Sequence, residues 1–219
     1  MKNISILFLV FITACSSTKI IKYSALPKIV EGEGILIKGI KNLNQIRGHH
    51  LFEFAKNTLS GTNKVIFLPE QEYFLLQKGI NKEYLYGDQT SDSIRSIIAE
   101  QTNCRYILSI EVLNSQKGGT FGSYTSLELD RYNSHYYEDN ETNNANLIFK
   151  ILDTKGNFTK NEFQITTKIN PLIINEGDGE TRINATTEFS AITKAFEKGI
   201  RQLKKGVVKK QYQNPSRQQ

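Results

Sequence analysis

Apolar and polar residues recur along this chain with two different periods, which predict an ordered series of strands and helices. Short apolar runs bounded by glycine or proline predict buried strands over Gly34–Ile40 and Lys64–Pro69. Between them, apolar residues three and four positions apart predict a helix over Gln45–Leu59. The first half of the chain therefore begins as strand, helix, strand.

The same periodicity continues through the middle of the chain. Glu70–Lys78 predicts a short helix that ends before Gly79, and a helix capped by Thr90 or Ser91 is expected to end at Thr102. Apolar residues at every second position make Arg105–Asn114 the clearest strand.

A hairpin and a long helix complete the pattern. Leu147–Leu152 and Phe158–Ile169 predict two strands joined by a tight turn, Asn175–Asn184 predicts a polar loop, and Phe189–Leu203 carries a helical apolar stripe. The order is strand-helix-strand-helix-helix-strand, hairpin, C-terminal helix. It predicts an α/β fold in which helices pack on a mixed β-sheet.

The segment 115–146 interrupts this order as a polar, tyrosine-rich excursion. Its aromatic residues have no apolar period that would place them in a core, and its polar residues leave no continuous lipid-facing side. Tyrosine buries a large area at low entropy cost and keeps a polar group, so these aromatic residues are the predicted partner-binding residues. They are Phe121, Tyr124, Tyr132, Tyr136 and Tyr137. The alternative is a disordered loop whose tyrosines simply fold over the edge of the sheet.

The amino-terminal residues predict a lipid anchor. Residues 1–14 have a short charged start and an apolar run, and Ile12-Thr13-Ala14-Cys15 fits the bacterial lipobox. The apolar run from Ile4 to Ala14 is too short to span a bilayer of about 30 Å. Cys15 is therefore the predicted lipidation site, where palmitate and diacylglyceryl chains would anchor the chain. The alternative is an ordinary secretory signal in which Cys15 is incidental.

These features divide the chain into a signal peptide, a tether and one domain. Residues 1–14 are the predicted lipoprotein signal peptide, 15–31 a lipidated tether, 32–210 a single α/β domain, and 211–219 a disordered tail. Because Ser16 follows Cys15, where an aspartate would retain a lipoprotein in the inner membrane, the expected location is the outer membrane, facing the periplasm.

Composition excludes several kinds of chemistry. The chain has 219 residues, a net charge of +6, two cysteines and three histidines, so neither a disulfide framework nor a histidine-built metal site is expected. Asp139-Asn140-Glu141 and Asp178-Gly179-Glu180 offer oxygen ligands without the spacing of a calcium loop. Cys104 is expected in the core. We predict no catalytic residue, no metal, no cofactor and no nucleic-acid partner, and hence no enzyme activity.

The element order resembles the envelope lipoprotein family that includes the curli-export lipoprotein CsgG, the penicillin-binding-protein activator LpoB and the amino-terminal domain of TolB. The residues that carry the resemblance are the helix-to-strand passage at Asn103–Leu108, the hairpin with its Asp153-Thr154-Lys155-Gly156 turn, and the closing helix at Phe189–Leu203. The resemblance implies a mixed sheet with packed helices and members that act mostly through protein partners. CsgG also forms an export pore from inserted amphipathic hairpins, and the present sequence has no convincing pair of them.

Together these observations predict a lipid-anchored, non-catalytic envelope lipoprotein that acts through protein–protein contacts or self-assembly. Its expected partners are the membrane, other envelope proteins and further copies of itself. The alternative is a periplasmic binder of glycan or peptidoglycan that uses the same tyrosines, and a third hypothesis is a subunit of an export pore.

Overall fold

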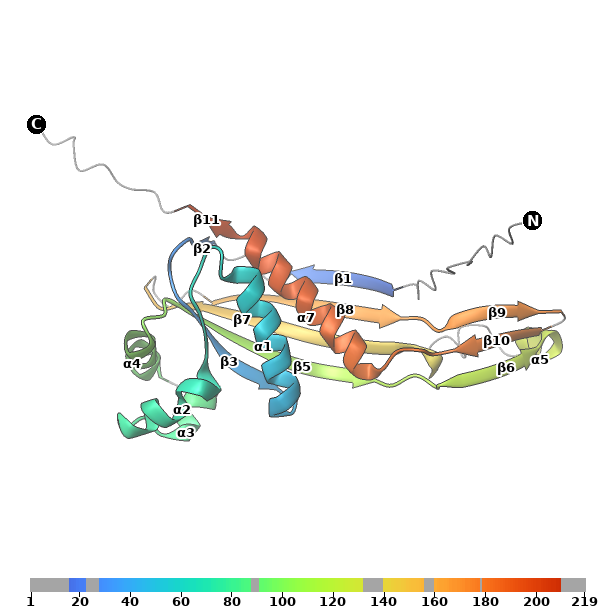
Figure 1. The fold of residues 1–219 in the computed structure, drawn as a ribbon, viewed down its shortest axis with the longest axis horizontal. Helices are drawn as coiled ribbons and strands as arrows, with labels where there is room; N and C mark the ends of the chain where they lie inside the picture. The colour runs from blue at the N-terminus through green and yellow to red at the C-terminus, as the bar shows by residue number, and fades with distance from the viewer. Residues whose placement is uncertain are drawn as a thin grey trace, which may run out of the picture.

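The main body of the protein is a six-stranded mixed sheet with helices on both faces (Figure 1). A computed structural model describes residues 16–22, 28–87, 91–131, 140–155, 160–177 and 179–209. The helices are α1 (Gln45–Leu59), α2 (Leu68–Gln77), α3 (Lys82–Tyr86), α4 (Asp92–Thr102), α5 (Ser126–Arg131) and α7 (Glu188–Lys205). The predicted α/β fold is confirmed.

The main sheet has the strand order β1-β8-β7-β5-β3-β4. Its strands are β1 (Ser16–Lys22), β3 (Ile35–Lys41), β4 (Val65–Phe67), β5 (Tyr106–Gln116), β7 (Asn143–Asp153) and β8 (Lys160–Ile169). β3 runs parallel to β4 and β5, and the other neighbouring pairs are antiparallel. A small parallel pair joins β2 (Ile29–Val30) to β11 (Val207–Val208) after the last helix.

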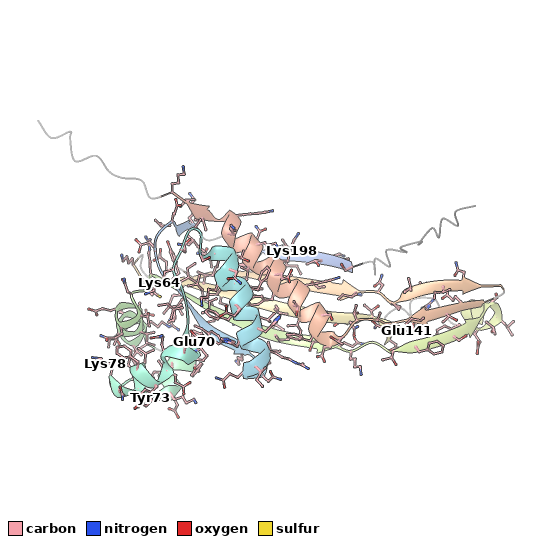
Figure 2. The ribbon with its side chains drawn as sticks, viewed as in Figure 1. Lys64, Glu70, Tyr73, Lys78, Glu141 and Lys198 are labelled. Atoms are coloured by element: carbon pink, nitrogen blue, oxygen red, sulfur yellow. The ribbon has the colours of Figure 1, made fainter. Side chains whose placement is uncertain are left out.

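A second sheet extends from one end of the main sheet as a narrow arm (Figure 1). Its strands are β6 (Phe121–Thr125), β9 (Leu172–Glu176) and β10 (Gly179–Ile183), in the order β6-β10-β9. β6 follows β5 and β9 follows β8, so the arm prolongs two strands of the main sheet. We call β6, α5, β9 and β10 the arm. Glu141 lies at the point where the arm leaves the main sheet (Figure 2).

One face of the main sheet is covered by α1 and α7, which cross the strands in front of the viewer in Figure 1. The largest hydrophobic cluster lies between them and the sheet, and it includes Phe149, whose ring stacks on Phe163 with centroids 5.0 Å apart. Gly199 of α7 lies so close to the Phe149 ring that an added Cβ would overlap it. The long apolar stripe of α7 thus packs directly against the centre of the sheet.

The other face carries a smaller cluster under α2, α3 and α4, which includes Leu36, Leu75, Ile98 and Cys104. Cys104 is 3% exposed, and burial raises the pKa of its thiol, so the unreactive protonated form is favoured. The expectation that Cys104 belongs to the core is confirmed.

Most predicted elements are present with similar bounds. α1 covers the predicted Gln45–Leu59. α4 has its N-cap at Ser91, ends at the predicted Thr102 and has its C-cap at Asn103, which adopts the left-handed conformation with φ 51°. Two predictions are wrong. The predicted tether contains strand β1, because Thr18 bonds to Thr167 and Ile20 packs on the core. The predicted loop over Asn175–Asn184 contains all of β10 and the end of β9. Residues 1–15 and 210–219 lie outside the described ranges.

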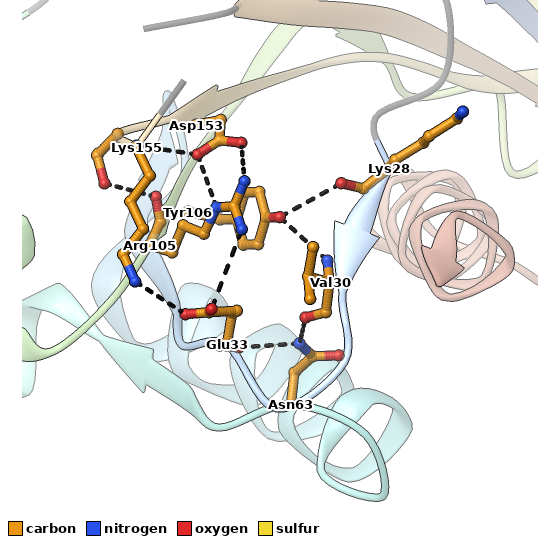
Figure 3. Close-up of polar contacts among 9 residues, drawn as sticks. Lys28, Val30, Glu33, Asn63, Arg105, Tyr106, Asp153 and Lys155 are labelled. Atoms are coloured by element: carbon orange, nitrogen blue, oxygen red, sulfur yellow. Dashed lines mark hydrogen bonds and ion pairs between the residues drawn. The ribbon is translucent and has the colours of Figure 1, made fainter. Parts of the chain in front are cut away.

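An ion-pair network fixes the hairpin turn between β7 and β8 to the start of β5 (Figure 3). The Arg105 guanidinium donates two hydrogen bonds to Asp153, at 2.9 and 2.8 Å. Glu33 lies 4.0 Å from Arg105 and 3.6 Å from Lys155. Partial burial raises the pKa of the Asp153 carboxyl, but the hydrogen bonds from Arg105 and from the Lys155 backbone N–H outweigh it and hold that pKa below its ordinary value.

We expect this network to contribute stability that is lost in acid. A carboxyl whose pKa is lower in the folded than in the unfolded chain stabilises the fold above the unfolded value, about 3.9 for Asp, and loses that contribution as the pH falls through the folded value. Asp153→Asn should therefore lower the free energy of unfolding by about 1.5 kcal/mol at pH 7, and by progressively less below pH about 4. Urea titrations from pH 7 to pH 2 measure this. Asp92→Asn, which changes a more exposed ion pair with Arg95, is the control, and equal effects of both variants would contradict the prediction.

Candidate partner-binding arm

The strand register of the arm creates one face with an apolar row. Ile183 of β10 is paired with Phe121 of β6 on one side and with Leu172 of β9 on the other. Residues paired across neighbouring strands project to the same face, so these three side chains lie side by side. Phe121 is 67% exposed, and Leu172 and Ile183 are partly exposed. Ile174 extends the same face by one row.

The arm has little core of its own. Among the described residues, no apolar side chain of the arm belongs to either hydrophobic cluster of the main body or packs against one. Leu127 and Ile173 are also exposed. Within the part of the chain that the structure describes, no strand pairs with the outer edges of β6 and β9. Open strand edges and exposed apolar side chains are features of surfaces that bind another chain.

The arm is attached to the main sheet through a buried ionic cluster. The Arg182 guanidinium, 5% exposed, lies 3.3 Å from Glu141 and donates from Nε to Glu180 at 2.6 Å. The Tyr124 hydroxyl donates to Glu141, and the guanidinium carbon of Arg182 lies 5.5 Å from the centre of the Tyr124 ring. Burial alone lowers the pKa of Arg182, but the two carboxylates raise it overall, so this guanidinium stays charged. The cluster joins β6 and β10 to the start of β7.

A second buried network around Asn143 supports the ionic cluster. The Asn143 carboxamide donates to Asn184 Oδ1 at 2.9 Å and to the Thr186 backbone carbonyl at 3.0 Å, and its oxygen accepts from the Gly118 N–H at 2.9 Å. Asn184 in turn donates to the Glu141 carbonyl at 2.8 Å. A side chain at Gly118 would collide with that carbonyl, which explains the glycine. These bonds satisfy the buried polar groups and hold the base of the arm in one geometry.

The structure brings together only part of the predicted site. Phe121 is exposed on the arm, whereas Tyr124 is half-buried in the ionic cluster. Tyr132, Tyr136, Tyr137 and Cys15 lie outside the described residues. The sequence does not predict Arg182 as a site residue, nor does it predict that Glu141 and Glu180 both contact it. In the sequence analysis the two glutamates are considered only as oxygen ligands for a cation. No local pattern links Glu141 to Arg182, which is 41 positions further along the chain.

Among the described residues, one group could offer three ligand atoms to a cation. His49 and Glu53 of α1 and Glu70 of α2 have ligand atoms within 4.8 Å of one another. His49 Nδ1 lies 3.7 Å from a Glu70 oxygen, and all three side chains reach solvent. This spacing also suits an ordinary surface ion pair.

Comparisons with known proteins give distant likenesses only. No protein-family model matches the chain, and no curated protein matches it. Two PelC dodecamer structures from Paraburkholderia phytofirmans are similar to it, one of them a single-residue variant, with 14% and 12% identity and TM-scores of 0.46 and 0.44. They cover 86% of this chain and 98% and 97% of theirs. Lipoprotein GNA1162 from Neisseria meningitidis has 10% identity and a TM-score of 0.41, over 63% of this chain and 83% of its own. No assignment of function follows from these likenesses.

None of the helices in the described part of the chain combines the length and the apolar character needed to span a bilayer.

Proposed function

We propose that this protein is a lipid-anchored, non-catalytic lipoprotein of the outer membrane that assembles with further copies of itself in the periplasm through the arm. The observation that carries the proposal is the arm: a three-stranded sheet with an exposed apolar row, two outer edges that no described strand covers, and a firmly bonded base. Such a surface costs stability in an isolated domain, so a partner chain is the simplest reason for it.

The geometry of the arm favours a second copy as the partner. β6 and β9 both run antiparallel to β10, so they are parallel to each other at opposite edges. The outer edge of β6 on one copy can therefore pair with the outer edge of β9 on the next, and the pairing can repeat. A repeated head-to-tail contact between two different surfaces produces a ring when its rotation closes and a filament when it does not.

The test of assembly uses the full chain, extracted from membranes with detergent. We expect analytical ultracentrifugation to show an oligomer, and Phe121→Asp to lower the mass to that of one chain because it places a charge in the apolar row. Tyr73→Asp is the matched control: Tyr73 is 74% exposed on α2, at the end of the molecule away from the arm (Figure 2). A single-chain mass for the unchanged protein would overturn self-assembly, and equal masses for both variants would overturn assembly through the arm. If the unchanged protein then binds purified sacculi and Phe121→Asp does not, the glycan-binding alternative is favoured.

The lipid anchor is tested separately at Cys15. Labelled palmitate should be incorporated by the unchanged chain and not by Cys15→Ser, which should leave the membrane fraction. Incorporation of label into Cys15→Ser would overturn the anchor, whatever the result for the arm.

A further inference from the structure

Three side chains of metal-binding type converge where α1 passes the start of α2. His49 and Glu53 are four positions apart on α1, which places both on the same side of that helix. Glu70 is in the first turn of α2, directly after β4 (Figure 2). One possible ligand atom of each residue lies within 4.8 Å of the other two. The imidazole and the two carboxylates therefore surround one point, and nothing in the proposed assembly function uses them.

The separation of His49 from Glu70 suits two ligands of one ion better than a direct hydrogen bond. His49 Nδ1 lies 3.7 Å from a Glu70 carboxylate oxygen. A hydrogen bond from nitrogen to oxygen is shorter, at about 2.7 to 3.2 Å. Two atoms bound to the same tetrahedral zinc ion, each at about 2.1 Å, lie about 3.4 Å apart. A small contraction would therefore place both atoms on one ion.

The ligand atoms of the cluster are accessible to an ion. Among the described residues, the side chains of His49, Glu53 and Glu70 have no hydrogen-bond partner, and all three are roughly half exposed. Besides His49, the described cation within ion-pair distance of these two carboxylates is Lys56, whose ammonium lies 3.7 Å from Glu53. That ammonium also lies 5.8 Å from the centre of the Phe52 ring, so it keeps a favourable neighbour when an ion displaces it from the carboxylate.

Two buried aromatic rings hold the cluster in place before an ion arrives. The centre of the His49 ring lies 6.1 Å from the ring centres of both Phe52 and Phe67. These two phenylalanines stack on each other, with ring centres 4.6 Å apart. Phe52 belongs to α1, and Phe67 ends β4, three positions before Glu70. The aromatic pair thus fixes α1 against the start of α2, and this preorganisation lowers the ordering cost of binding.

The ligand types favour a divalent transition-metal ion. Imidazole nitrogen suits zinc and other first-row transition metals, whereas calcium and magnesium select oxygen ligands. One histidine and two carboxylates give zinc three protein ligands, and the fourth tetrahedral position is then available to water. The two carboxylates also balance the charge of a divalent ion.

We propose that His49, Glu53 and Glu70 bind a zinc ion that links α1 to α2. α1 packs on one face of the main sheet and α2 on the other. Between them in sequence lies β4, a strand of three residues at the outer edge of that sheet. An ion shared by the two helices joins them around this edge and stabilises it. The proposal does not depend on assembly through the arm.

The experiment uses the detergent-solubilised full chain, freed of metal with a chelator, and zinc chloride as the probe in isothermal titration calorimetry. We expect one zinc ion per chain and a higher melting temperature with zinc, because an ion that binds the folded chain stabilises it. His49→Ala and Glu70→Gln should each bind zinc at least 10-fold more weakly. His50→Ala is the matched control: it removes the adjacent exposed histidine of α1, whose ring lies beside Phe189, and should leave zinc binding unchanged.

A change of ligand type tests the site independently of the loss of a side chain. His49→Glu replaces the nitrogen ligand with oxygen, so the preference for zinc over calcium should fall at least 10-fold. An unchanged preference would overturn the assignment of His49 as a ligand. Absence of zinc binding, equal binding by His49→Ala and the unchanged chain, or an equal loss in His50→Ala would overturn the site. Phe121→Asp should retain zinc binding while it lowers the oligomer mass, which separates this proposal from the assembly function.

Discussion

Replacing Arg182 with leucine is expected to lower the free energy of unfolding by about 3 to 5 kcal/mol. The guanidinium is 5% exposed and has two carboxylates as neighbours. Its removal leaves the negative charges of the buried Glu141 and the half-buried Glu180 without this counter-charge. Chemical denaturation followed by circular dichroism measures the change. The arm should also become the first part of the chain that a protease cuts.

A control and a rescue make this result specific. Arg201→Leu removes an exposed arginine that pairs with Glu197 at 2.9 Å, and it should cost no more than about 1 kcal/mol. Arg182→Leu combined with Glu141→Leu should recover part of the lost stability, since the buried charge opposite Arg182 is then absent as well. An Arg182→Leu effect as small as that of Arg201→Leu would show that the cluster is solvated.

Gly199→Val should lower the free energy of unfolding by about 1 to 3 kcal/mol through overpacking. The new side chain would overlap the Phe149 ring, which cannot move aside easily because it is fully buried and stacked on Phe163. Thermal unfolding measures the loss. Gly48→Ala is the matched control in a second helix: with nothing near its Cβ, it should raise stability by about 1 kcal/mol.

A double-mutant cycle distinguishes overpacking from an effect on helix propensity. Phe149→Leu shortens the ring that meets position 199, so the two substitutions together should cost less than the sum of their separate effects. Strict additivity would show that α7 does not press on Phe149.

The elements of the main body could be predicted because their signals are local. The α1 stripe, the Ser91 cap and the end of α4 at Thr102 depend on residues a few positions apart. The local pattern does not predict β1, because its pairing with β8 depends on residues distant in sequence and its Ser, Thr and Lys residues hide the inward positions of Thr18 and Ile20. In the arm, the pattern predicts a loop in place of β10 because charged and polar residues dominate Gly179–Ile183.

The candidate sites show the same limit. Phe121 was predicted as a contact residue from composition, and its exposure is consistent with that role, but the network of Arg182 and Asn143 that orients the arm has no local signature. Lys38 and Lys41 of β3, Lys82 of α3 and Lys150 of β7 all line one cavity, and only the fold brings these four lysines together. Local periodicity identifies elements, whereas the convergence of side chains depends on topology.

The pairing of β1 with β8 also constrains the order in which the chain can fold. Thr18 and Thr167, which bond to each other across the two strands, are 149 positions apart in sequence. β1 precedes the other strands of the main sheet in the sequence and is synthesised before them. Closing so long a loop is entropically costly until the intervening sheet has formed, so β1 is the last of these strands able to pair. Until then β8 is an edge strand, and its exposed Lys160 and Lys168 hinder pairing with another unfinished chain. We therefore expect the risk of aggregation to be greatest in the interval before the amino-terminal strand reaches β8.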